Sequence, residues 1–198
     1  SSMVWEGCTP HFIDIEKDGL TLDPKKLPDT PRREVEGILA THVYGNTCDV
    51  EGIADYADKH NLKVIYDAAH AFDVSYNGKS ICKYGDIVTM SFHATKLFHT
   101  GEGGAVITND DQLAHRISYS RNFGHNGPED YWGLGINGKN SELHAAMGLA
   151  VLPYVEELIQ SRKKVAAIYD RLLHRSIVSR PRIRSGTEYN YAYYPVLF

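Results

Sequence analysis

Two groups that could do chemistry stand where buried strands are expected to end. Asp67 follows the apolar run 62–66 within the segment YDAAHA, and Lys96 comes within one turn of the apolar run 87–92. Both runs are rich in β-branched residues, which is typical of strands covered on both faces in a parallel sheet. Because ligands of open parallel sheets bind beyond the carboxyl ends of the strands, we expect Asp67 and Lys96 to face one crevice.

A lysine and a carboxylate in one crevice fit a particular cofactor chemistry. A lysine that attacks a carbonyl must be uncharged for part of the time, which an apolar surrounding favours. A carboxylate beside a pyridine ring keeps the ring nitrogen protonated, and a protonated pyridine is a strong electron sink. Glycines behind the lysine would let backbone or ligand approach closely. Lysine and aspartate are the minimum set for pyridoxal 5′-phosphate, although a buried ion pair between Asp67 and Lys96 explains the same two residues.

The elements that must position these groups alternate between strand and helix. Further strands are expected at 37–45 and 104–110, and Asp49 is placed to cap an amphipathic helix whose apolar positions run from Val50 to Ala57. Strand, helix and strand at this spacing form a βαβ unit. The predicted fold class is therefore α/β, with a parallel-rich sheet sandwiched by helices.

The second half of the chain indicates a loop followed by helices. Residues 122–140 hold five glycines and one proline, which indicates a long loop of the kind that is usually functional or mobile. The segment SELHAAMGLAVL predicts a buried helix capped by Ser141, and Pro153 is expected to open a second, amphipathic helix. The final run YNYAYYPVLF indicates a strand, and its tyrosines are expected to pack within it.

Composition argues against several classes of protein. The chain has 198 residues, a net charge of −4, no basic stripe and no run of 18 apolar residues, so neither nucleic acid nor a membrane is an expected partner. Cys8, Cys48 and Cys82 are far apart and odd in number, which favours a reduced cytoplasmic protein over a disulfide framework. His93 and His99 have no usual zinc spacing, so no metal site is expected.

Several linked motifs resemble one known family. They are VIYDAAHAF, then SFHATKLFHTGEGGAVITND with its lysine 29 positions after the aspartate, and then GLGINGKNSELHAAMG. Any one of them would be a weak signal, but the linked set is specific. The chain closely resembles the DegT/DnrJ/EryC1/StrS family of nucleotide-sugar aminotransferases of fold-type I, from WEGCTPHFIDI to the long helix near residue 175.

The resemblance implies a role for five residues. Lys96 matches the lysine that holds pyridoxal 5′-phosphate covalently and later moves a proton, and Asp67 matches the partner of the pyridine nitrogen. His70 occupies a position, often Gln, near the ring hydroxyl, and Ser91 matches a hydroxyl that binds the cofactor phosphate. Asn137 resembles an asparagine that reaches the phosphate in the neighbouring subunit, which implies a homodimer with shared active sites.

The implied activity is transamination. An amino donor, glutamate by family analogy, would supply the amine for a keto-sugar on a nucleotide carrier, in deoxyaminosugar synthesis for polysaccharide or glycoconjugate. Relatives with histidine in place of the lysine are sugar dehydratases, and a non-catalytic or regulatory relative that keeps the fold is the other alternative. The form GINGKNSE departs from many relatives, which have an aromatic residue after the first Gly and an Arg two residues past the Asn. The sugar, the carbon and the nucleotide are therefore not assigned.

The family pattern also implies that this chain is a fragment. In the family, a Gly-Thr turn that binds the phosphate and an aromatic residue that stacks on the cofactor precede the segment that matches SSMVWEGC. Residues 1–152 are expected to form part of the cofactor-binding large domain. Residues 153–198 are expected to form the long helix and first strand of a truncated small domain. Without those parts, the fragment alone is expected to bind the cofactor poorly or not at all and to be inactive.

Overall fold

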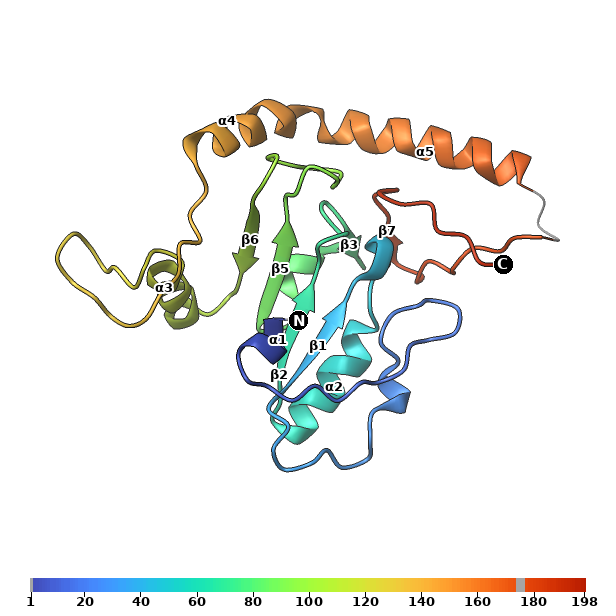
Figure 1. Ribbon diagram of the computed structural model, residues 1–198. Helices are drawn as coiled ribbons and strands as arrows, with labels where there is room; N and C mark the ends of the chain where they lie inside the picture. Colours follow the sequence, from blue (N-terminus) through green and yellow to red (C-terminus); the bar gives the residue numbers. More distant parts are fainter. Residues whose placement is uncertain (1, 174–176) are drawn as a thin grey trace.

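The computed structural model describes residues 2–173 and 177–198, and its centre is a four-stranded sheet (Figure 1). The strands lie in the order β1 (Gly37–Thr41), β2 (Lys63–Asp67), β5 (Ile87–Ser91) and β6 (Gly104–Ile107). The first three run parallel, whereas β6 is antiparallel to β5. The predicted α/β class with a parallel-rich sheet is confirmed.

Helix α2 (Val50–His60) covers one face of this sheet. The carboxylate of Asp49 accepts a hydrogen bond of 3.0 Å from the Gly52 N–H and so caps the helix, as predicted. Asn61 ends it in the left-handed conformation. The buried side chains of the helix join those of the strands in one apolar core: Ile38, Ala40, Val50, Ile53, Ala57, Val64, Tyr66 and Val88. The strand–helix–strand unit thus has the predicted form.

The opposite face of the sheet is less covered than the sequence predicts. Leu39 is 41% exposed and Val106 is 50% exposed, whereas Ile38 and Ala40 beside Leu39 are buried. Successive strand side chains point to opposite faces, so an apolar run alone does not tell whether both covering layers are present. Among the described residues, the face of the sheet that carries Ile38 and Ala40 is buried as expected, whereas the face that carries Leu39 is partly exposed.

The long helices cross above the carboxyl ends of the parallel strands (Figure 1). Helix α4 (Glu142–Val151), a 3-10 turn (Leu152–Tyr154) and α5 (Val155–Leu172) follow one another along this edge. Ser141 caps α4 through a hydrogen bond from the His144 N–H, as predicted. Helix α3 (Asp111–Ser120) lies to one side, before the 122–140 loop. The ends of the strands therefore have helices above them.

The expectation that α4 is a buried helix is wrong for the described chain. Leu143 is 83% exposed and Leu149 is 73% exposed, and only Gly148 is buried. Apolar side chains surround this helix, but just one side of it packs on the chain. There a Cβ at position 148 would lie 2.8 Å from Thr100 Cγ2, so the missing side chain allows close approach to the loop behind Lys96.

The C-terminal run is also not the strand that was predicted. Strand β7 covers only Thr187–Glu188 and pairs with β3 (Ser75–Tyr76), which also pairs with β4 (Lys79–Ser80). The chain then leaves the extended conformation, with Tyr191 at a φ of 53°. Side-chain hydrogen bonds, which an aromatic-rich pattern does not encode, hold this segment. The division into two domains at residue 152 stays a prediction.

The remaining short elements complete the chain. They are α1 (Ser2–Trp5) and the 3-10 turns η1 (Pro24–Lys26), η2 (Val43–Gly45) and η3 (Ile81–Lys83). The turn η2 directly follows His42, at the carboxyl end of β1. Tyr44 within this turn has a φ of 56°, an uncommon conformation for a bulky residue.

His42, directly after β1, is a fully buried histidine. Its Nδ1 accepts a hydrogen bond of 3.0 Å from the Cys48 N–H, and its ring stacks on Tyr66 with the centroids 4.8 Å apart. Burial lowers the pKa of His42 to about 4. The imidazole of His42 is therefore protonated below about pH 6.5 in the unfolded chain, but only below about pH 4 in the folded chain.

We predict that the folded state loses about 3 kcal/mol through His42 as the pH falls from about 6.5 to about 4. The test is urea unfolding across this range for the parent and for His42→Gln, which cannot titrate but keeps an acceptor for Cys48. The parent should be the more stable near pH 7.5, and its advantage should shrink as the pH falls. An advantage that does not change with pH would contradict the prediction.

Candidate functional site

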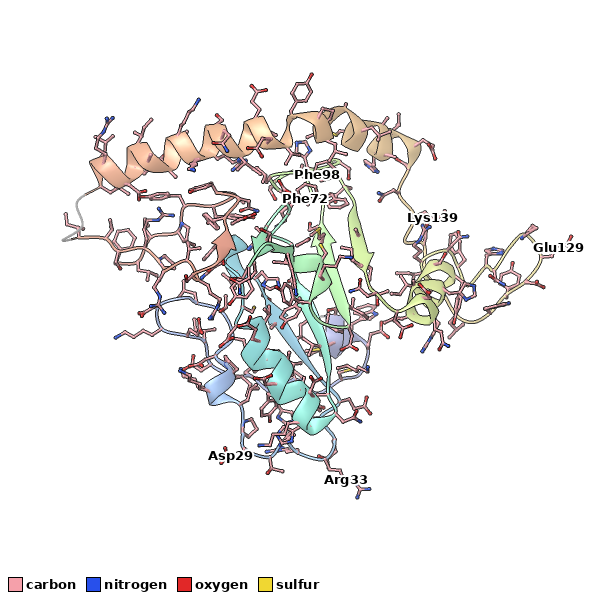
Figure 2. The ribbon with its side chains drawn as sticks, turned by 180° about the vertical axis from the view of Figure 1, so that it is seen from behind. Asp29, Arg33, Phe72, Phe98, Glu129 and Lys139 are labelled. Atoms are coloured by element: carbon pink, nitrogen blue, oxygen red, sulfur yellow. The ribbon has the colours of Figure 1, made fainter. Side chains whose placement is uncertain are left out.

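Lys96 lies in the loop after β5, and backbone hydrogen bonds join the two ends of this loop. The Phe92 N–H donates to Gly103 O over 2.8 Å, and the Thr100 N–H donates to Phe92 O over 2.9 Å. Between these bonds, Leu97 and Phe98 are buried next to α5. Figure 2 shows Phe98 and Phe72 side by side beneath the helices, and their ring centroids are 4.4 Å apart. Lys96 is half-buried beside this anchor.

Asp67 and Ser91 are the last residues of β2 and β5, so the parallel strands deliver them to one edge. In the register, Asp67 lies between Thr41 of β1 and Thr89 of β5. Its Oδ1 accepts a hydrogen bond of 2.9 Å from the Ala69 N–H, and its Oδ2 has no hydrogen bond to any described residue. Ser91 Oγ accepts a long hydrogen bond of 3.4 Å from the His93 N–H. One carboxylate oxygen therefore remains available at the centre of this edge.

His70 connects the aspartate and the lysine electrostatically. Its Nδ1 accepts a hydrogen bond of 3.1 Å from the Tyr44 N–H, so Nε2 carries the proton of the neutral ring. Burial lowers the pKa of His70, the charge of Lys96 lowers it further, and the charge of Asp67 acts in the opposite sense. Lys96 lies near His70 because the hydroxyl of Tyr193 is 3.5 Å from Lys96 Nζ and the ring of Tyr193 packs on that of His70.

The alternative of a buried ion pair receives no support from the described residues. Their ion pairs do not include one between Asp67 and Lys96. Instead, Lys96 Nζ lies 3.5 Å from the hydroxyl of Tyr193. Asp67 and Lys96 therefore do not neutralise each other in an ion pair.

Asn137 lies apart from the other predicted site residues. It belongs to the 122–140 loop, which projects beside α3 in both views and is marked by Glu129 and Lys139 in Figure 2. Its Oδ1 accepts a hydrogen bond of 2.9 Å from Lys139 Nζ. Large apolar side chains of the loop are exposed around it: Tyr131, Trp132, Leu134 and Ile136. Whether Asn137 serves a second subunit stays a prediction.

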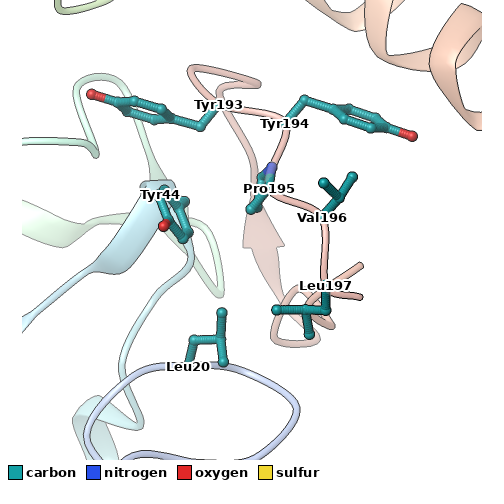
Figure 3. A pocket seen from close by; sticks show the side chains of 7 residues that line it. All are labelled: Leu20, Tyr44, Tyr193, Tyr194, Pro195, Val196 and Leu197. Carbon is teal, nitrogen blue, oxygen red and sulfur yellow. The ribbon is translucent and has the colours of Figure 1, made fainter. Parts of the chain in front are cut away.

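The structure adds an aromatic cluster that the sequence did not indicate. The ring of Tyr193 lies 4.5 Å from that of His70 and 5.6 Å from that of Tyr44. Together with Leu20 and residues 194–197, these tyrosines line a cavity of about 270 Å³ (Figure 3). Tyr193 and Lys96 are 97 positions apart in the sequence, so no local pattern could have linked them.

The groups at this edge fit the chemistry of pyridoxal 5′-phosphate. An amine, a carboxylate oxygen without a partner among the described residues, an imidazole Nε2–H and a serine hydroxyl are what an aldehyde, a pyridine nitrogen, a ring oxygen and a phosphate require. Three of these groups, on Lys96, Asp67 and Ser91, come from the carboxyl ends of adjacent parallel strands or just beyond them. The donor set is therefore suitable for the cofactor.

Residues 2–173 and 177–198 contain neither a metal-binding cluster nor a membrane-spanning helix. No group of three or more His, Cys, Asp or Glu side chains there is arranged to hold a metal ion. None of the helices in this part of the chain has both the length and the apolar character needed to cross a membrane. The three cysteines are free thiols.

Comparison with known proteins gives consistent matches along the whole chain. A sequence profile of the DegT/DnrJ/EryC1/StrS aminotransferase family matches residues 1–198. A dTDP-4-amino-4,6-dideoxy-D-glucose transaminase of Shigella dysenteriae is 39% identical over 197 residues, which make up 99% of this chain and 54% of the relative. A GDP-perosamine synthase of Caulobacter vibrioides is 36% identical over 187 residues, or 92% of this chain and 50% of the relative.

A solved structure gives the same result in three dimensions. The crystal structure of DesI in the presence of its TDP-sugar product matches with a TM-score of 0.89 at 34% identity. The match covers 97% of this chain and 49% of that chain. The present chain thus spans about half the length of the relatives that it matches.

We predict that Gly103→Ala destabilises the fold by about 1–3 kcal/mol, because the new Cβ would overlap Thr100 Oγ1 at the base of the Lys96 loop. Gly103 also has a φ of 152°, which disfavours a side chain. Gly127→Ala is the matched control, since its φ is 101° and no atom lies within 4 Å of the added Cβ. Urea unfolding should give a clearly larger loss for Gly103→Ala, and equal losses would contradict the packing argument.

Proposed function

This chain belongs to the DegT/DnrJ/EryC1/StrS aminotransferase family, and from that membership we propose that the intact protein is a pyridoxal 5′-phosphate-dependent aminotransferase. Its proposed substrates are a keto-sugar on a nucleotide carrier and an amino donor. The observation that carries the proposal is that Asp67 and Ser91 end adjacent parallel strands, at the edge where Tyr193 both packs on His70 and contacts the amine of Lys96. A lysine and a carboxylate at one site are the minimum set for this cofactor.

Lys96 is the proposed catalytic residue. The cofactor, when bound, supplies an electron sink that stabilises negative charge on the substrate carbon. Lys96 Nζ would hold the cofactor covalently, and its amine would serve as the base that moves a proton at the substrate carbon. Lys96 is half-buried beside the anchored residues Leu97 and Phe98, and its amine lies 3.5 Å from the hydroxyl of Tyr193.

Asp67, His70 and Ser91 are the proposed binding residues. The carboxylate of Asp67 would bind the pyridine nitrogen and favour its protonated form, through the oxygen that does not accept from the Ala69 N–H. Because the pKa of His70 is lowered by burial and by Lys96, the ring is neutral near pH 7 and offers its Nε2–H to the ring oxygen. Ser91 Oγ, at the end of β5, would bind the phosphate.

The names of the relatives support a sugar substrate. They describe a transaminase for a dTDP-linked aminodeoxy sugar and a synthase of GDP-perosamine. We propose glutamate as the amino donor, by analogy with the family. We place the reaction in deoxyaminosugar synthesis for a polysaccharide or glycoconjugate.

We further propose that the protein acts in the cytoplasm as a homodimer with shared active sites. The free state of Cys8, Cys48 and Cys82 supports a reducing compartment. The exposed apolar side chains around Asn137 support a partner surface on the 122–140 loop, since contiguous apolar patches mark interaction sites. In the dimer, Asn137 would reach the phosphate held by the neighbouring subunit.

We predict that Lys96→Ala in the full-length protein abolishes covalent attachment of pyridoxal 5′-phosphate, while the variant stays folded because Leu97 and Phe98 still anchor the loop. Attachment is measured by borohydride trapping and peptide mass, and folding by circular dichroism. Lys164→Ala, at an exposed position of α5, is the control and should retain attachment at Lys96. Trapping at other lysines with none at Lys96 in the parent would reject the assignment.

We predict that a panel of nucleotide-linked keto-sugars, incubated with the full-length protein and glutamate, includes one that gains an amine, detected by mass. Asp67→Asn should lower the rate by at least about 100-fold, because a neutral amide does not hold the ring nitrogen protonated. Loss of water from a sugar instead of gain of an amine would favour the dehydratase alternative. No reaction with any sugar, despite cofactor at Lys96, would favour a non-catalytic relative.

A further inference from the structure

The amine of Lys96 has one hydrogen-bond partner among the described residues, the hydroxyl of Tyr193. The Nζ–Oη distance is 3.5 Å, at the long end of the range for a hydrogen bond. The ring of Tyr193 meanwhile packs against His70 and Tyr44, which fixes the direction in which the hydroxyl points. Tyr193 therefore reaches the proposed catalytic atom from a segment that the sequence had assigned to strand packing.

A set of partly buried side-chain hydrogen bonds holds the segment that carries Tyr193. The hydroxyl of Tyr189 lies 2.9 Å from Tyr44 O and 3.0 Å from Tyr193 O. Asn190 is buried, and its Nδ2 donates to His70 O over 3.0 Å and to Phe72 O over 2.8 Å. The C-terminal segment is thus tied directly to the backbone of the loop that carries His70.

A phenol is a suitable partner for an amine that must change its protonation state. The oxygen of a phenol accepts a hydrogen bond from an ammonium group, and its O–H donates one to a neutral amine. A carboxylate would instead favour the charged amine, which does not attack a carbonyl. Lysine also has a long, flexible side chain, so a fixed partner reduces the number of conformations it samples before it reacts.

We propose that Tyr193 is a positioning residue for Lys96. Its hydroxyl holds the amine on the His70 side of the crevice, ready for the cofactor aldehyde, and Tyr189 and Asn190 hold Tyr193 in place. This inference rests on the proposed function, because it assigns to Tyr193 a part in the reaction of Lys96 with pyridoxal 5′-phosphate. It gives the tyrosine-rich run a role that strand packing does not.

The test compares Tyr193→Phe with Tyr191→Phe in the full-length protein. Tyr191 lies in the same segment and packs on Tyr189, and its hydroxyl has no hydrogen bond to a described residue, so it is a matched control. Pyridoxal 5′-phosphate is added to the cofactor-free protein, samples are reduced with borohydride at intervals, and the label on Lys96 is measured by peptide mass. Attachment joins Nζ to the aldehyde carbon with loss of water, and the borohydride makes that bond permanent.

Tyr193→Phe should slow attachment at Lys96 by about twofold to tenfold, the range expected for loss of one hydrogen bond. Tyr191→Phe should match the parent. Tyr189→Phe is a second variant that should also slow attachment, since it loosens the segment while keeping the Tyr193 hydroxyl. The other lysines should be methylated by formaldehyde and reductant to the same extent in all variants. A general loss of structure would change this extent, so equal methylation shows that the variants remain folded.

The outcomes separate the inference from the proposed function. If the parent is labelled at Lys96 and Tyr193→Phe is labelled at the same rate, the positioning role is overturned while the proposed function stands. If the parent is not labelled at Lys96, the proposed function fails and the inference fails with it. A slower rate in Tyr191→Phe equal to that in Tyr193→Phe would also overturn the inference, because the effect would not depend on contact with Lys96.

Discussion

The parallel pairing of β2 with β1 and β5 is the constraint on which the site depends. Parallel strands end at the same edge, so Asp67 arrives between Thr41 and Thr89 without any contribution from its own side chain. The loop after β5 then returns through the hydrogen bonds between Phe92, Thr100 and Gly103. Sheet geometry thus sets where the carboxylate lies, and loop closure sets where the lysine lies. Neither group needs an ion pair with the other.

His70 is the point where this edge meets the end of the chain. Tyr44 orients its ring from the first βα connection, and Asn190 binds its backbone carbonyl from the C-terminal segment. Tyr193 packs on the same imidazole while its hydroxyl faces Lys96. Residues from two distant parts of the sequence, the first βα connection and the C-terminal segment, therefore converge on His70. Side-chain hydrogen bonds from Asn190 to His70 O and Phe72 O hold the C-terminal segment after strand β7 ends at Glu188.

The sequence predicted what local patterns encode and missed what long-range contacts decide. The four central strands, the cap at Asp49, the cap at Ser141 and the loop at 122–140 follow from spacing and capping chemistry, and the structure contains them. Candidate positions for Lys96, Asp67 and His70 also came from motifs. The exposure of α4 and of Leu39 was missed because apolar composition does not tell which side of an element is covered. Tyr193 was missed because its contact crosses half of the chain.

The most direct test of this account is a crystal structure of the full-length protein after soaking with pyridoxal 5′-phosphate. The account predicts continuous electron density from Lys96 Nζ to the cofactor, with the Asp67 carboxylate beside the pyridine nitrogen and His70 beside the ring oxygen. Cofactor density joined to another lysine, or Asp67 and Lys96 facing separate surfaces, would contradict it.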